Sequence, residues 1–299
     1  VRHIFLELTE AIILEDFEQS ALKVERIDHG LYRLIDSFNF MCYLVVGTKK
    51  AALIDTMSGI GNLPQTIERI LSQEGKSELE VDVFLTHHHI DHCGGAYWFN
   101  SARFSPLEDG RWTEIEQHAN KYVLQMPHLI SAPINEKNRP EIIHVSEGDS
   151  FSLGNYTIEV FSLPGHTKGS TGYLIKELGI LLSGDAVTPI MCLCFEDSLS
   201  ISAWQRTLSK MKSIPFTYFL TGHHQSPFGK DSLDSFISAG TFAENDRGIE
   251  WHHGIVEDWK GTCHLCPCET FDADSPNFRA VITPGLPRRR KKKSKSKQN

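Results

Sequence analysis

Long apolar runs are absent from this sequence of 299 residues. No stretch approaches the roughly 18–20 consecutive apolar residues of a membrane-spanning helix, so we expect no membrane span. The first ten residues, VRHIFLELTE, interrupt their apolar residues with acids, which does not fit a signal peptide. Because the sequence begins without Met, some trimming is expected, and whether an upstream segment was removed is left open.

The cysteine pattern does not fit a disulfide framework. Seven Cys is an odd count without framework spacing, which indicates a reducing compartment. We therefore expect a cytoplasmic protein, with a nuclear location open if the source is eukaryotic. Cys263, Cys266 and Cys268 have the spacing of a metal or redox motif. Reduced thiols in a surface extension are favoured over a zinc site completed by His264 or His253.

Basic charge is scarce except at the end of the chain. The net charge is −8, but residues 288–299 contain eight Lys or Arg and no acid. Residues 1–287 therefore carry 22 basic and 38 acidic residues, or −16. This balance disfavours nucleic acid as a partner, because duplex binding needs a basic surface. The basic tail has no apolar residue to bury, so we expect it to be disordered, and its role is left open.

Short apolar runs alternate with helical patterns along the rest of the chain. Alternation, turn residues and capping signals predict strands and helices that form two similar cycles. In the first cycle we expect strands at 41–46, 51–54 and 81–85 and a helix that begins after Asn62. In the second we expect strands at 156–160, 171–175, 180–182 and 218–220 and helices near 204–211 and 232–242.

Each cycle ends on a strand that delivers histidine, Phe84-Leu85-Thr86-His87 in the first and Phe219-Leu220-Thr221-Gly222-His223 in the second. This likeness indicates an internal duplication with two sheets face to face. Between the cycles, residues 104–147 show little periodicity. A lid or binding loop and a helical surface insert are both compatible with that stretch.

The densest chemical signal is Thr86-His87-His88-His89-Ile90-Asp91-His92-Cys93-Gly94-Gly95. His87 and His89 project to the same side of an extended loop, because side chains alternate along it. Imidazole and carboxylate are ligands that suit zinc, iron or manganese. Further candidates are His166, Asp185 and His223, each of which follows a Gly at a strand end. Glycine permits the sharp turn that points such a side chain into a cleft.

As a set, His-x-His-x-Asp-His, Pro-Gly-His-Thr-x-Gly-Ser, Ser-Gly-Asp and Gly-His resemble the metallo-β-lactamase superfamily over residues 25–245. The resemblance implies an α+β fold, a four-layer αββα sandwich with a dinuclear metal site at one edge of the sheets. It implies that His87, His89 and His166 bind one metal, that Asp91, His92 and His223 bind the other, and that Asp185 bridges both. The ions would be two divalent metals, zinc first, with iron or manganese as alternatives.

Neighbouring residues receive other roles. His88 and His224 are expected to support the ligands, and Cys93 is expected to be a small buried residue. Asp55 matches an acid of the family that looks structural and lies near the metal loop.

The resemblance implies a hydrolase in which a metal-bridging hydroxide cleaves a carboxylic ester, lactone or thioester, with Asp91 orienting it and accepting its proton. The alternatives are a phosphodiesterase or nuclease of the same fold, a β-lactamase, and an iron-dependent persulfide dioxygenase. A β-lactamase of the family normally lacks the bridging acid, so Asp185 disfavours that activity. We expect a small-molecule substrate, and the residues that bind it and the oligomeric state are left open.

The expected organisation is a catalytic domain over residues 1–248 with the insert at about 104–147. A C-terminal extension over 249–287 and the tail over 288–299 follow.

Overall fold

The computed structural model describes residues 22–123, 130–253, 259–268 and 272–285. Three antiparallel and three parallel strand pairs build its first sheet. Its seven strands follow the order of the chain. They are β1 (Lys23–Asp28), β2 (Leu31–Ile35), β3 (Met41–Val46), β4 (Ala51–Ile54), β5 (Val81–Phe84), β6 (Ser101–Phe104) and β7 (Glu141–His144). The predicted hairpin of β3 and β4 is confirmed.

Helix α2 (Leu63–Gln73) joins β4 to the parallel strand β5. The side chain of Asn62 accepts a hydrogen bond from the amide of Gln65, as the predicted N-cap requires. The buried face of the helix includes Leu63, Ile67 and Ile70, which follow the predicted amphipathic stripe. After β5 come α3 (Ile90–Cys93) and a 3₁₀ turn, η1 (Gly94–Trp98).

The second sheet repeats this plan with the order β14-β13-β11-β10-β9-β8. Its strands are β8 (Ser150–Ser152), β9 (Thr157–Ser162), β10 (Thr171–Ile175), β11 (Ile180–Leu182), β13 (Tyr218–Leu220) and β14 (Phe228–Gly229). Helix α5 (Ile201–Met211) lies in the crossover between the parallel strands β11 and β13, as α2 does between β4 and β5. This correspondence supports the predicted duplication. The turn η5 (Lys230–Ser232) and α6 (Leu233–Asn245) follow.

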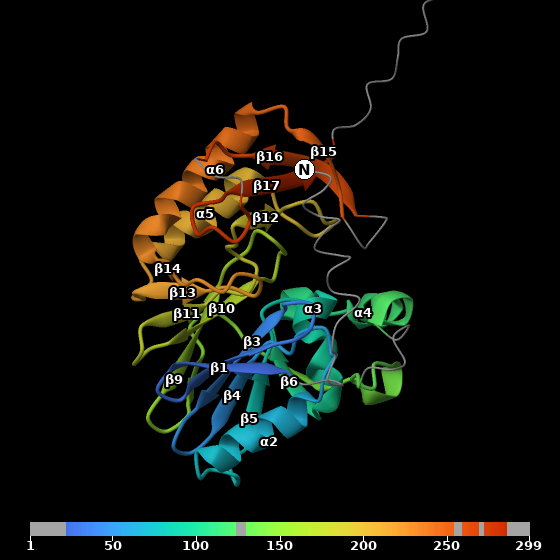
Figure 1. Cartoon of the computed structure of the whole chain (residues 1–299), viewed down its shortest axis with the longest axis vertical. Coiled ribbons are helices and arrows are strands. Elements are labelled where there is room, and N and C mark those ends of the chain that lie inside the picture. The colour runs from blue at the N-terminus through green and yellow to red at the C-terminus, as the bar shows by residue number, and fades with distance from the viewer. Residues whose placement is uncertain (1–21, 124–129, 254–258, 269–271, 286–299) are drawn as a thin grey trace, which may run out of the picture.

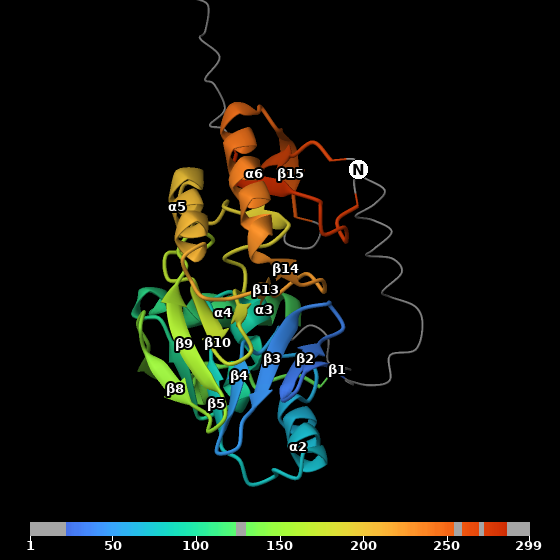
Figure 2. The ribbon, with the colours of Figure 1, turned by 90° about the vertical axis from the view of Figure 1, so that its left-hand side faces the viewer.

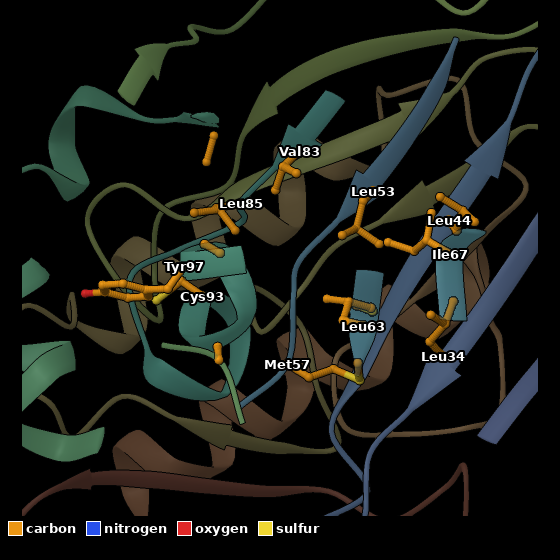
Figure 3. Close-up of a cluster of buried hydrophobic side chains, with 14 of the residues drawn as sticks. Leu34, Leu44, Leu53, Met57, Leu63, Ile67, Val83, Leu85, Cys93 and Tyr97 are labelled. Atoms are coloured by element: carbon orange, nitrogen blue, oxygen red, sulfur yellow. The ribbon is translucent and has the colours of Figure 1, made fainter. Parts of the chain in front are cut away.

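Three apolar cores separate four layers. Alternation along each strand sends Leu44 towards α2, whereas its neighbour Tyr43 lies between the sheets with Tyr173. Leu174, next to Tyr173, instead packs with residues of α5 and α6. Figure 3 shows part of the core beside α2, with Leu44, Leu63 and Ile67 among its side chains. The predicted αββα sandwich is confirmed, and Figure 2 shows the two sheets beside each other.

A third sheet of four strands was not predicted. It has the order β12-β17-β16-β15 and consists of β12 (Ile190–Cys192), β15 (Ile249–His252), β16 (Lys260–Leu265) and β17 (Ala280–Pro284). In Figure 1 these strands lie at the same end of the molecule as α5 and α6. Because β12 pairs with β17, strands on both sides of residue 248 share this sheet. The domain boundary there stays a prediction.

The surface placement expected for the C-terminal thiols is wrong for two of them. Cys263 and Cys266 are buried, because β16 packs Cys263 against Phe278 and Ile282 and Cys266 joins the core beside α6. Both are free thiols, in agreement with the expected reduced state.

The stretch 104–147 is a partly helical insert that ends in a strand of the first sheet. It contains η2 (Pro106–Glu108), α4 (Trp112–His118), the π-turn η3 (Ala119–Val123) and η4 (Glu136–Asn138), and β7 follows. The described helices include none that is both long and apolar enough to cross a bilayer. The basic tail lies outside the described residues.

Candidate metal centre

The first histidine cluster lies on the loop between β5 and α3. His87 Nε2 lies 3.1 Å from His89 Nδ1, so the two rings do meet on one side of the loop. His166, on the loop between β9 and β10, places its Nε2 atom 2.9 Å from the same His89 nitrogen. One nitrogen from each ring lies within 4.8 Å of the others, which is a geometry that can hold a metal ion.

The second cluster combines the start of α3 with two strand ends of the second sheet. His223 Nε2 lies 3.2 Å from His92 Nε2 and 3.2 Å from Asp91 Oδ2. Asp185 completes the group, with its Oδ2 atom 3.0 Å from His223 Nε2. These four side chains also offer ligand atoms within 4.8 Å of one another.

Asp185 lies between the two clusters. Its Oδ2 atom is 3.8 Å from His166 Nε2, and its Oδ1 atom is 3.4 Å from His92 Nε2. The Oδ1 atom is buried and has no hydrogen-bond partner among the described residues. A buried carboxylate oxygen without a partner is costly unless a cation compensates it. This orphaned atom and the two clusters are compatible with bound divalent cations.

The two clusters differ in the protonation of their histidines. Burial lowers the pKa of His87, and the imidazoles of His92 and His89 lower it further, so its ring is held neutral. Burial opposes the charge on His223, but Asp185 and Asp91 outweigh burial and raise the pKa of His223 to about 10. Burial also opposes ionisation of Asp185, yet His223 and His92 hold the pKa of that carboxyl well below its usual range. Zinc is ligated by neutral imidazoles and ionised carboxylates, so the proton of His223 would have to leave when a metal binds there.

Asp55 orients His92 from the end of β4. Its Oδ2 atom accepts a hydrogen bond from His92 Nδ1 over 2.8 Å, which leaves His92 Nε2 facing the second cluster. Both carboxylate oxygens also accept from Thr86, the backbone amide at 2.8 Å and the hydroxyl at 2.9 Å. The supporting role expected for Asp55 agrees with this geometry, because such acids fix the ring orientation of a ligating histidine.

Glu108, which the sequence analysis missed, joins the two histidine loops. One of its carboxylate oxygens accepts from the backbone amide and the ring of His88. The other accepts from the hydroxyl of Thr167 and the amide of Gly169, both at 2.7 Å. His88 therefore supports the loop, as expected. No local motif marks Glu108, because it belongs to the irregular stretch after β6.

A main-chain atom holds His166 in place, which side-chain motifs could not predict. His166 Nδ1 hydrogen-bonds the carbonyl oxygen of Cys192 at 2.8 Å, so a strand of the third sheet orients a ring of the first cluster. His224 is buried and donates its backbone amide to the Thr221 hydroxyl, which agrees with the supporting role expected for it. Cys93 is buried as expected.

Glycines before the candidate ligands serve different purposes. Gly184 has a φ of +51°, as the predicted sharp turn requires. Gly222 is needed for space, since a Cβ there would lie 2.4 Å from His92 Cε1 and 3.1 Å from Asp185 Oδ1. The strand end can therefore approach the second cluster only without a side chain.

The centre opens into a cavity of about 390 Å³. Aromatic rings surround the candidate ligands: Phe195 lies 4.5 Å from His89 between ring centroids, and Phe40 lies 5.3 Å from His223. Trp251 and Trp259, on or beside strands of the third sheet, add to the wall. The structure thus brings all seven predicted ligands together in two adjoining clusters, and five of them line the cavity: His89, Asp91, His166, Asp185 and His223. Their role as ligands stays a prediction.

Comparison with known proteins finds a family model and relatives that are similar in sequence. Residues 41–223 match the family model described as the metallo-beta-lactamase superfamily. An acyl-coenzyme A thioesterase MBLAC2 of Gallus gallus is 29% identical over 161 residues, which cover 48% of this chain and 56% of that protein. A hydroxyacylglutathione hydrolase of Rhodopseudomonas palustris is 24% identical over 194 residues, which cover 64% of each protein. The chain therefore spans less than two thirds of the length of either relative.

Two solved structures show the same fold. A metallo-beta-lactamase from Pontibacter korlensis superposes with a TM-score of 0.55 at 16% identity, covering 74% of this chain and 99% of that one. A metallo-beta-lactamase family protein of Thermus thermophilus superposes with a TM-score of 0.51 at 22% identity, covering 71% and 80%. The matched family region exceeds half of the chain and contains all seven candidate ligands, so the protein belongs to the metallo-β-lactamase superfamily.

Proposed function

We propose that the protein is a metal-dependent hydrolase that cleaves a carboxylic ester, lactone or thioester. The observation that carries this proposal is Asp185, whose buried carboxylate lies between two ligand clusters with one oxygen unpartnered. When bound, two divalent ions supply an acidified water and polarise the carbonyl oxygen of the substrate. The ions would be held by His87, His89 and His166 on one side and by Asp91, His92 and His223 on the other.

Asp91 is the side chain that acts on the reacting water in this proposal. It lines the cavity beside His223 and Asp185. Burial opposes its ionisation, but His92 and His223 lower the pKa of Asp91, so it stays a carboxylate near neutral pH. An ionised acceptor at this position orients the water and receives its proton. A general base must lie within hydrogen-bond distance of the proton that it accepts.

Acyl chemistry is favoured by the names of the relatives. An acyl-coenzyme A thioesterase and a hydroxyacylglutathione hydrolase both act on acyl derivatives. We extend that chemistry to this chain as part of the proposal, together with zinc as the metal, a small-molecule substrate and a cytoplasmic location. The donor set supports zinc, because imidazole and carboxylate suit a Lewis-acid zinc site.

A hydrolysis panel combined with metal analysis tests the proposal. Purified protein would be assayed on lactones, thioesters, aryl esters, β-lactams and phosphodiesters, with bound metals counted by mass spectrometry. We expect acyl hydrolysis with about two zinc ions per chain. Asp185→Asn and His166→Ala should lose that activity and part of the metal while keeping their circular dichroism spectrum.

An exposed substitution, Leu107→Ala, serves as the matched control and should keep both activity and metal. One iron per chain without hydrolysis would contradict the proposal. Full activity in both site variants would show that the site is assigned to the wrong residues.

A further inference from the structure

The wall of the cavity around the candidate ligands is largely aromatic and aliphatic. Nine Phe, Trp or Ile side chains among the described residues line it. They are Phe38, Phe40, Ile60, Ile90, Ile190, Phe195, Trp251, Trp259 and Ile282. Such a wall favours an apolar group, since each methylene moved out of water stabilises binding.

Lys and Arg are absent from the described part of that wall, which lines the 390 Å³ cavity. Recognition of a phosphate or carboxylate group on a substrate usually needs Arg or Lys.

A neighbouring cavity of about 230 Å³ does not supply the missing positive charge. It shares His89, Phe195 and Trp259 with the first cavity and also contains Arg111 and Lys260. Three acids, Glu114, Glu196 and Asp197, line the same space. Arg111 already pairs with Glu114 at 3.2 Å. An anionic carrier would therefore meet more acids than bases there.

Trp259 lines both cavities. Its ring centroid lies 4.8 Å from that of Phe195 and 5.1 Å from that of His253. The ring centroid of Trp259 also lies 5.8 Å from that of His118 of α4. Trp259 comes from the segment beyond residue 223, which the family model does not match. Trp251 and Trp259, on or beside the third sheet, thus line the cavity next to the candidate ligands, although they lie outside the region that the family model matches.

We infer that this site selects substrates whose acyl group is apolar and whose leaving group is uncharged, and that Trp259 is a specificity-determining residue for the acyl group. The inference rests on the proposed acyl hydrolase function and names its substrate class. It sets this protein apart from its named relatives, since coenzyme A and glutathione are both anionic carriers. A neutral apolar lactone, ester or thioester fits the described wall.

Matched thioesters provide the first test. Butanoyl and octanoyl groups would be presented on N-acetylcysteamine, which is uncharged, and on coenzyme A, whose reactive thiol end has the same chemistry. We expect the kcat/KM of the uncharged thioester to equal or exceed that of the coenzyme A thioester. A coenzyme A thioester that is cleaved ten times better or more would overturn the inference.

The dependence of kcat/KM on salt concentration provides a second, independent test. Residues 1–287 carry −16, so an anionic substrate is repelled and added salt should screen the repulsion. Raising ionic strength from 0.02 to 0.3 M, roughly a fourfold shorter Debye length, should increase kcat/KM for the coenzyme A thioester. It should leave the N-acetylcysteamine thioester nearly unchanged. A decrease for the coenzyme A thioester would reveal a cation site and contradict the inference.

Trp259→Ala tests whether Trp259 determines the selectivity for the acyl group. In the parent, kcat/KM should rise roughly two- to fourfold per methylene from acetyl to octanoyl, because each methylene is buried. The variant should flatten this slope while keeping its metal content, and Trp259→Phe should restore most of the slope.

Leu107→Ala, which lines neither cavity, controls for truncation of an apolar side chain. An unchanged slope in Trp259→Ala would refute its role. The absence of any acyl hydrolysis would refute the proposed function. Hydrolysis that favours charged carriers would refute only this inference.

Discussion

Asp55 and Asp185 occupy equivalent positions in the two halves of the sandwich. Asp55 directly follows β4 and hydrogen-bonds His92 Nδ1 at 2.8 Å, whereas Asp185 follows β11 and lies 3.4 Å from His92 Nε2. Two acids from equivalent strand ends thus face the two nitrogens of one imidazole ring. One sets the orientation of the ring, and the other faces the space where a metal would lie.

Replacing Asp55 by Asn should weaken the second metal position. Asn keeps the size of the side chain and tolerates the φ of +63° at this residue, but its amide cannot serve both Thr86 and the Nδ1–H of His92. We expect metal affinity to fall about 10- to 100-fold, as for other residues that orient a ligating histidine. Zinc titration with a competing chelator measures the change.

Asp82→Asn, at a half-buried ion pair with Arg103, is the control for the loss of one carboxylate. If Asp55→Asn binds both metals as tightly as the parent, Asp55 does not orient His92.

Adding a methyl group at residue 222 should disturb the second cluster without unfolding the protein. The new Cβ of Gly222→Ala would lie 2.4 Å from His92 Cε1, so the ring must move away from its position. We expect loss of one metal per chain and at least a roughly tenfold loss of kcat, because small displacements of positioned groups are costly to rate.

Gly229→Ala is the matched control for that substitution, because a Cβ at residue 229 meets nothing within 4 Å. Equal metal content in the two variants would contradict the expectation.

Replacing Glu108 by Ala should lower the stability of the fold more than it alters catalysis. Burial opposes ionisation of Glu108, but its hydrogen bonds with His88 outweigh burial and lower its pKa. Glu108→Ala would leave the buried amides of His88 and Gly169 without a partner. We expect the free energy of unfolding to fall by about 3 kcal/mol in urea titrations.

Glu114→Ala removes an exposed partner of Arg111 and should cost no more than about 0.5 kcal/mol. Similar losses in the two variants would argue against a special role of Glu108.

Asp36 should make stability depend on pH. Burial raises the pKa of Asp36 to about 6, although Ser58 and the amides of Phe38 and Phe40 donate hydrogen bonds to it. Its neutral form therefore contributes stability that is fully present below about pH 4, the pKa in the unfolded chain, and is lost as pH rises through 6.

Asp36→Asn keeps acceptor and donor atoms at this position but cannot ionise. Relative to the parent, the variant should gain roughly 3 kcal/mol between pH 4 and pH 7, which denaturant titrations at both values would measure. A stability difference that does not change with pH would contradict the expected ionisation of Asp36.

Local signals were sufficient for the two duplicated cycles. The boundaries of β3, β4, β10, β11 and β13 follow from apolar runs bounded by turns, and Asn62 begins α2 as its side chain predicts. The third sheet escaped prediction because β12 is three residues long and pairs with β17, which lies about ninety residues further along the chain. Such pairing depends on distant segments and leaves no local pattern.

The sequence by itself determined the fold family and the set of candidate ligands, because ligand types and their spacing are local features of a chain. Only the tertiary structure decided how they are supported and what surrounds them. Asp55 and Glu108 orient histidine loops that lie more than fifteen residues away in sequence. Trp259 reaches the cavity through a sheet that closes late in the chain. Packing brings these residues together, and packing is a property of the whole chain.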